Sequence, residues 1–242
     1  MRERESEWQE ASAGLRLIAS AMIVQLVLVV FTLLVIVLVV SSKKAEGMQV
    51  VGMLFAAVGL VAQIMLVAGV FRFASQPPPR PGASLAQAAG ALGIVGVVIS
   101  GYVLFVLLQV SSVGPESDYD AIRSAMDAAK QLPRIEVLAA VAGFLGITLL
   151  LAAASSVARH FQQKEIERKA KTAIAMVLLA SAIYAFVKLG VTPRETGGLI
   201  AALMMTTIVQ VAAFVNILGT VRGLADAVLA PPPPELPRAR SL

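Results

Sequence analysis

Residues 48–71 read MQVVGMLFAAVGLVAQIMLVAGVF and contain no Asp, Glu, Lys or Arg. The apolar residues form one continuous run, without the alternation that is typical of a strand in a membrane barrel. A bilayer core about 30 Å thick is crossed by ~20 apolar residues in a helix, which also satisfies its own backbone hydrogen bonds in lipid. The stretch therefore predicts a membrane-spanning helix.

Five further stretches show the same pattern, so the chain is expected to cross a membrane six times. Of its 242 residues, 58% are hydrophobic and 14% are charged, whereas a soluble domain carries roughly 25% charged residues. The predicted fold class is an all-α integral membrane protein, a six-transmembrane-helix bundle over residues 17–220. Its predicted spans are residues 17–40, 48–71, 85–110, 135–157, 170–189 and 198–220.

The segments outside this bundle predict two tails. Residues 1–16 are expected to form a cytoplasmic tail with an interfacial helix, because its apolar residues share one helical stripe and Trp favours the headgroup region. Residues 221–242 are expected to form a Pro-rich cytoplasmic tail, since the run APPPPELPRARSL at 230–242 disfavours helix. The N-terminal stripe consists of Trp8, Ala11, Leu15 and Ile18.

The distribution of Lys and Arg predicts how the chain is threaded. With the N-terminus inside, thirteen basic residues fall on the inner side and seven on the outer side. Basic residues collect on the cytoplasmic side of short loops. Both termini are therefore expected in the cytoplasm, in the inner membrane of a bacterium, an origin that the richness in Ala, Arg and Pro favours.

The third loop, residues 111–136, reads SSVGPESDYDAIRSAMDAAKQLPRIE and predicts a short amphipathic helix over 119–131, with the fourth span beginning at Pro133. Ile122, Met126 and Ala129 lie on its apolar face. Two interpretations stay open for this face. It either packs as a cover on the outer mouth of the bundle, or it forms a docking or gating surface.

The sequence contains little that catalysis or metal binding needs. It has one His, His160, and no Cys, so neither a zinc site nor a disulfide is expected. Ser156 lies one turn before His160, but no nearby acidic residue would orient the imidazole. No phosphate-binding loop or dinucleotide fingerprint occurs. We therefore expect no catalytic residue, no cofactor and no nucleic-acid partner.

Four uncharged polar residues lie within the predicted spans, namely Gln25, Gln63, Gln210 and Asn216. An unpaired amide in hydrocarbon is costly, so each should face protein or water. They either form hydrogen bonds between packed helices, or they line a polar cavity open to the cytoplasm.

These observations lead to three functional hypotheses. The first is a non-enzymatic structural or accessory subunit, whose helices contact lipid and other membrane proteins or copies of itself. Several stripes of small residues motivate it, because such stripes are typical of helix contacts in membranes. The alternative is a channel or uncoupled permease for a small solute. The third is an intramembrane enzyme.

Overall fold

The computed structural model describes residues 2–42, 48–112, 119–189 and 196–230, and within these ranges it contains six helices and no strand. Several side chains inside the helices lie outside the description, among them those of residues 186–189 and 196–207. The helices are α1 (Arg2–Ser42), α2 (Met48–Ala74), α3 (Ala83–Ser112), α4 (Tyr119–His160), α5 (Lys164–Leu189) and α6 (Thr196–Ala227).

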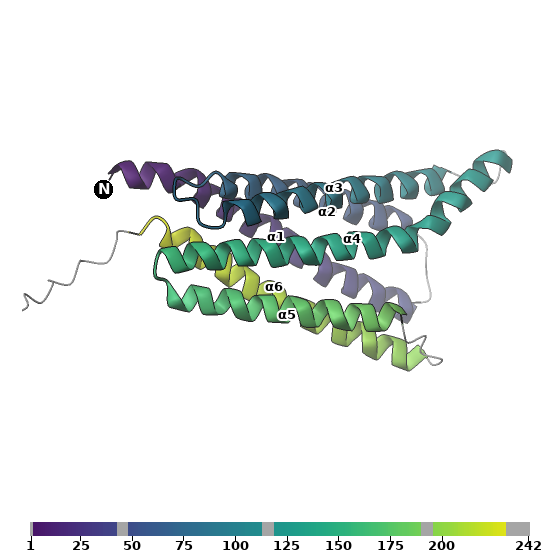
Figure 1. Cartoon of the computed structure of the whole chain (residues 1–242). Coiled ribbons are helices and arrows are strands. Elements are labelled where there is room, and N and C mark those ends of the chain that lie inside the picture. Colours follow the sequence, from purple (N-terminus) through teal and green to yellow (C-terminus); the bar gives the residue numbers. More distant parts are fainter. Residues whose placement is uncertain (1, 43–47, 113–118, 190–195, 231–242) are drawn as a thin grey trace, which may run out of the picture.

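The six helices form a closed ring in chain order. Each helix contacts the next one along the chain, and α1 contacts α6, while α4 and α6 make only minor contact across the ring. Figure 1 shows the helices running side by side, with the start of α1 and the end of α6 at the same end of the bundle. We refer to this end as the terminal end.

Five helices in the described part are long and apolar enough to cross a membrane. Large apolar side chains face outward from them, as lipid contact requires; Val98 is 66% exposed and Ile208 is 69% exposed. The chain is therefore a multi-pass helical membrane protein. The five segments are Trp8–Thr32, Val51–Ala74, Ala83–Ser112, Val137–His160 and Ile208–Ala227.

The predicted fifth span, residues 170–189, is not among these five segments. It lies in α5, whose first two turns, KEIERKAK, are highly charged. The side chains at its far end lie outside the described residues. The structure thus supports a helical membrane protein with five candidate spans, and a sixth span remains a prediction.

The sequence predicted an interfacial helix in the N-terminal segment, but the structure contains no separate helix among its described residues. The segment is the first part of α1, which runs without a break from Arg2 to Ser42. Its stripe faces the protein: Trp8 is 3% exposed, and Ala11, Leu15 and Ile18 are fully buried. The amphipathic pattern was identified correctly, but a protein core, rather than the bilayer surface, covers its apolar face.

The predicted C-terminal tail also begins later than residue 221. Helix α6 continues through Ala227, and Val221, Leu224 and Ala225 are buried in the core. The Ser12 hydroxyl donates a hydrogen bond to the Ala225 carbonyl at 3.1 Å, which joins α1 to α6. Residues 231–242, which contain the proline run, lie outside the described residues.

The prediction of a separate short helix over 119–131 was wrong. Helix α4 is continuous over 42 residues and passes through Pro133. Proline in a helix interior removes one backbone hydrogen bond and bends the helix without necessarily ending it. Figure 1 shows the first part of α4 at an angle to the remainder, projecting from the bundle at the end opposite the terminal end.

The apolar face of this first part of α4 is only partly covered. Ala125 is 4% exposed, and Ile122 and Ala129 are half-buried, whereas Met126 is 62% exposed. Gln109 of α3 donates a hydrogen bond to the Ser124 hydroxyl at 3.0 Å. The stripe therefore rests on the end of α3, and Met126 points away from it.

The tightest packing of the bundle lies at the terminal end. The buried core combines the start of α1, the end of α2, the start of α3, the end of α4, the start of α5 and the end of α6, and Leu15, Phe73, Leu151, Ile217 and Leu224 are among its largest members. Helices α1 and α2 touch through their backbones there. A Cβ atom on Gly14 would lie 2.6 Å from the carbonyl oxygen of Gly69.

Candidate functional site

The inside of the ring contains three adjoining cavities about halfway along the helices. Their volumes are about 160, 370 and 370 Å³. Gln63 of α2 lines all three cavities, Gln25 of α1 lines two, and Gln210 of α6 lines one. Three of the four polar residues that the sequence singled out therefore line neighbouring cavities, which share Gln63.

Gln63 is held in place by α3. The Ser100 hydroxyl donates a hydrogen bond to Gln63 Oε1 at 2.9 Å. Gly96, one turn earlier on α3, leaves room for the amide, since a Cβ there would lie 3.6 Å from the same oxygen. One amide acceptor is thus paired, and the amide nitrogen has no hydrogen-bond partner among the described residues.

Gln25 and Gln210 are half-buried and have no side-chain hydrogen-bond partner within the described part of the chain. An unpaired amide in an apolar medium carries a desolvation cost, so such groups are normally satisfied by protein or water. Here the cavity is the space from which a partner can reach them. The three amides therefore offer hydrogen-bonding atoms to whatever occupies the cavity.

Asn216 does not take part in this cluster. Its Nδ2 donates to the Ala212 carbonyl at 3.0 Å within α6 and lies 3.2 Å from Met176 Sδ of α5. The interpretation as a packing contact between helices applies to this residue. Gln63 combines both interpretations, because it bonds Ser100 and also lines the cavities.

The small residues of the predicted stripes mostly face inward. Gly59 faces Leu28 of α1, Gly93 faces Val67 of α2, and Gly146 faces the backbone of Ala89. Gly143 lines two of the cavities, and a Cβ there would meet no atom within 4 Å. The stripes are therefore explained by contacts inside this chain and by the cavity wall.

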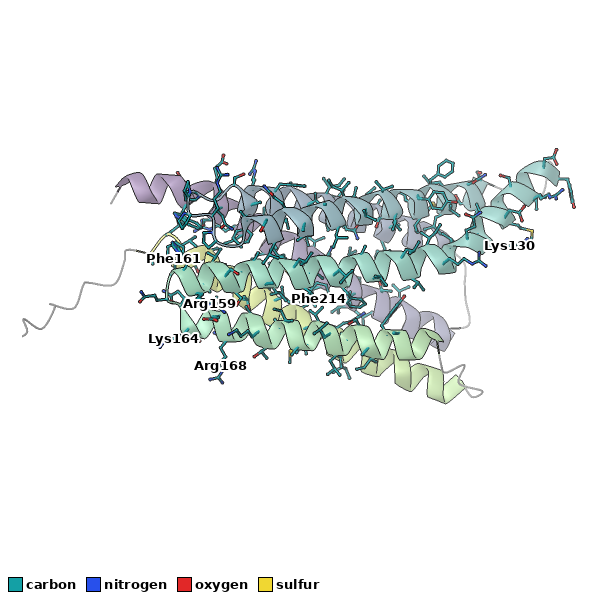
Figure 2. The ribbon with its side chains drawn as sticks, in the orientation of Figure 1. Lys130, Arg159, Phe161, Lys164, Arg168 and Phe214 are labelled. Carbon is teal, nitrogen blue, oxygen red and sulfur yellow. The ribbon has the colours of Figure 1, made fainter. Side chains whose placement is uncertain are left out.

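Three aromatic residues of the site, Phe144, Tyr184 and Phe214, were missed by the sequence reasoning. Tyr184 lines one cavity and packs edge-on against Phe144, with ring centroids 6.1 Å apart. Phe214 lines two cavities, and Figure 2 shows it about halfway along the bundle. Phe214 lies one turn from Gln210, and this spacing could have identified it.

Among the residues that the structure describes, no Asp, Glu, Lys, Arg or His lines any of the three cavities. The lining includes the three amide side chains, Ser100, Tyr184 and many aliphatic side chains. Such a surface suits an uncharged ligand, because a charge would leave water without a counter-ion. The expected opening of the cavity to the cytoplasm stays a prediction.

The residues considered for catalysis or metal binding do not converge. The Ser156 hydroxyl donates to the Ala152 carbonyl at 3.0 Å, and the His160 ring packs edge-on against Phe161. Within the described ranges, no group of three His, Cys, Asp or Glu side chains is positioned to hold a metal ion.

Charged residues gather at the turn between α4 and α5, at the terminal end. Glu167 accepts from Lys171 at 2.8 Å and from Arg159 at 3.0 Å. These two cations lower the pKa of Glu167. Figure 2 shows Arg159, Lys164 and Arg168 together at this end and Lys130 at the other. The cluster joins α4 to α5 and does not reach the cavities.

Comparison with known proteins gives no relative from which to infer a function. No family model matches the chain, and neither a curated protein nor a solved structure matches it.

Proposed function

We propose that this protein is a non-enzymatic, six-span membrane protein that accommodates a small uncharged solute in the cavities around Gln63 and acts as an uncoupled permease. The observation that carries the proposal is that Gln25, Gln63 and Gln210, from three different helices, line neighbouring cavities that share Gln63.

The size and lining of the cavities define the class of solute. Cavities of about 370 Å³ are at the small end of the range for ligand sites. The solute is therefore a small molecule with one or two hydrogen-bonding groups on an apolar body. Coupled transport normally uses ionisable residues inside the membrane. The described part of the cavity walls contains none, which favours facilitated movement without ion coupling.

The proposed placement follows the charge distribution. The terminal end lies at the cytoplasmic face of an inner membrane. Helix α5 crosses the membrane in addition to the five candidate spans, which gives six crossings. The basic residues around Arg159 and Arg168 then face the anionic inner leaflet, which attracts them.

A specific observation supports a second candidate, the accessory subunit. The first part of α4 projects from the bundle with Tyr119 73% exposed and Met126 62% exposed. Amphipathic aromatic and Met side chains are enriched in protein interfaces. In this alternative, the projecting part contacts another membrane protein, and the cavities have no transport role.

Flux measurements in proteoliposomes test the permease proposal. Vesicles with the native protein are compared with protein-free vesicles for entry of small uncharged alcohols and amides, followed by light scattering after an osmotic jump. We expect faster entry of at least one solute. Gln63→Leu and Gln210→Leu should reduce this entry about tenfold, because each removes a hydrogen bond to the solute.

A cavity-filling variant and a matched control make the test specific. Gly143→Leu fills the cavity without meeting another atom at Cβ, and Gly101→Leu adds the same side chain at an equally open position that lines none of the three cavities. Gly143→Leu should abolish the flux and Gly101→Leu should preserve it. No flux with any solute, or flux that none of the cavity variants changes, would leave the accessory-subunit candidate.

A further inference from the structure

A separate pocket lies where α2 ends and α3 begins, away from the internal cavities. Its volume is about 620 Å³, and it is lined by Phe71, Ala74, Ser75, Gln76, Arg80 and Gln87. The connecting segment, residues 75–82, joins the candidate spans Val51–Ala74 and Ala83–Ser112. A segment between the ends of two spans lies at the depth of the lipid headgroups.

Gln76 is the unusual residue of this pocket. It is 2% exposed, and neither its Nε2 nor its Oε1 has a hydrogen-bond partner. Nearly all buried polar side chains in folded proteins are paired, so an unpaired amide at the wall of a pocket indicates that a partner is missing.

Arg80 gives the pocket a positive charge. It has a left-handed backbone conformation, with φ of 53°, that is uncommon outside glycine. Its backbone N–H donates to Pro77 and its carbonyl accepts from Ala83, at 3.0 and 3.2 Å, so the turn is held at both sides. Among the described residues, no acidic side chain lines the pocket and Arg80 forms no ion pair.

The membrane side of the pocket is apolar. The ring of Phe71 lies so close to α3 that a Cβ on Gly90 would be 2.9 Å from it. Phe71 is 40% exposed. Its exposed part lines the pocket together with Arg80 and Gln87. A cation and amide donors beside an outward-facing aromatic ring match a phosphate group attached to an apolar molecule.

We propose that this pocket binds a phosphate group, which the headgroup of an anionic phospholipid supplies. Arg80 pairs with the phosphate charge, Gln87 donates from the rim, and the Gln76 amide turns into the pocket and gains its missing partner. Phe71 contacts the start of the acyl chains. The proposal is independent of the internal cavities and of any transport activity.

The full-length protein in a neutral detergent provides the test. Its unfolding temperature is measured during titration with short-chain phosphatidylglycerol, with inorganic phosphate, and with an anionic detergent that has no phosphate. The variants are Arg80→Gln and Gln76→Leu. The control is Arg72→Gln, which removes an exposed arginine at the same end of α2 that does not line the pocket.

We expect phosphatidylglycerol to raise the unfolding temperature of the native protein and of the control equally. Arg80→Gln and Gln76→Leu should require at least about fivefold more lipid for half of the effect. Gln76→Leu should also raise the unfolding temperature without lipid, because it removes an unpaired buried amide.

Each other outcome decides the question. If inorganic phosphate raises the unfolding temperature and loses this effect in Arg80→Gln and Gln76→Leu, the result supports the phosphate site. It then shows that a soluble phosphate compound, rather than a lipid, can fill the site. Equal weakening by Arg72→Gln, an equal response to the phosphate-free detergent, or no response to either phosphate compound overturns the proposal.

Discussion

Single residues decide how closely the helices of this bundle approach each other. Gly14 and Gly69 allow the backbones of α1 and α2 to touch, because a Cβ on either would meet backbone atoms of the other helix within 3 Å. Trp8 closes the same end by packing edge-on against Phe161, with ring centroids 5.0 Å apart. Both contacts place the start of α1 inside the protein.

Trp8 is the only Trp of the chain, so its fluorescence reports this contact alone. Since it is 3% exposed, we expect blue-shifted emission that neither acrylamide in water nor brominated lipid quenches. The unfolded protein serves as the quenchable control. Strong quenching by brominated lipid would instead support the interfacial position that the sequence predicted.

Gly14→Ala should lower the free energy of unfolding by about 1–3 kcal/mol, because the new methyl group forces the two backbones apart. The matched control is Gly219→Ala, where a Cβ meets no atom within 4 Å. The control should be neutral or slightly stabilising, since Ala favours helix more than Gly does. Denaturation in mixed detergent micelles measures both, and equal effects would contradict a close contact at Gly14.

At the scale of elements, α4 combines two environments in one helix. Its second part is a candidate span that borders the cavities, whereas its first part leans on the end of α3 through Ala125 and the bond between Gln109 and Ser124. One helix can both span the membrane and contact the end of α3, because the bend at Pro133 changes its direction without ending it.

Adjacent residues test the position of this first part. Ala125→Asp places a charge in a buried contact, so this part of α4 should separate from α3 and become accessible to protease. Met126→Asp places the same charge on a side chain that is 62% exposed and should leave the protection unchanged. Limited proteolysis of reconstituted protein measures both, and equal sensitivity of the two variants would show that the face is not packed as described.

The turn between α4 and α5 makes a prediction about pH. The pKa of Glu167 is lowered by its hydrogen bonds from Lys171 and Arg159. Folding therefore favours the carboxylate, and the stabilisation is present above the ordinary value of about 4.3 and is lost as the pH falls through the lowered value. Native protein should unfold at a higher temperature than Glu167→Gln near pH 7, and this difference should shrink below about pH 4.

Glu165→Gln is the control for this measurement. Glu165 is 80% exposed and, among the described residues, pairs with Lys169 of its own helix alone, whereas Glu167 connects two helices and is 17% exposed. The control should change the unfolding temperature less than Glu167→Gln does. A pH-independent difference would show that the Glu167 ion pairs do not stabilise the fold.

At the scale of the whole molecule, a ring in chain order is packed at one end and hollow in the middle. The core joins all six helices at the terminal end, and the cavities begin where this core ends. A ring of six helices encloses a space at its centre. This space stays open unless large side chains fill it. Gly, Ala and amide side chains take part in the lining together with large aliphatic ones.

The ring predicts an even number of crossings. The start of α1 and the end of α6 lie together, joined by the bond between Ser12 and Ala225. Reporters fused before Met1 and after Leu242 should therefore both read as cytoplasmic, and a reporter inserted at residues 190–195 should read as external. Opposite readings at the two ends would show that α5 does not cross the membrane.

Hydropathy and composition were sufficient to predict an all-helical membrane protein, because an apolar run long enough to span lipid has few other stable conformations. Each predicted span lies within one helix, but α1 and α4 begin about fifteen residues earlier than the predicted spans do. The polar residues were found for the same local reason, since an amide is conspicuous within an apolar run. The sequence could not show which of these residues line the cavities and which only join helices. Gln63 and Asn216 are both amides within apolar runs, although of the two only Gln63 lines the cavities.

Tertiary packing decided what the amphipathic and polar faces contact. The stripe from Trp8 to Ile18 suits a bilayer surface and a protein core equally well, and only the positions of α2, α4 and α6 settle which one covers it. Pro133 permits either a helix start or a bend, and the contact with α3 favours the bend. Gln25, Gln63 and Gln210 meet because the ring closes through α1 and α6, a contact between residues more than 200 positions apart that no local pattern encodes.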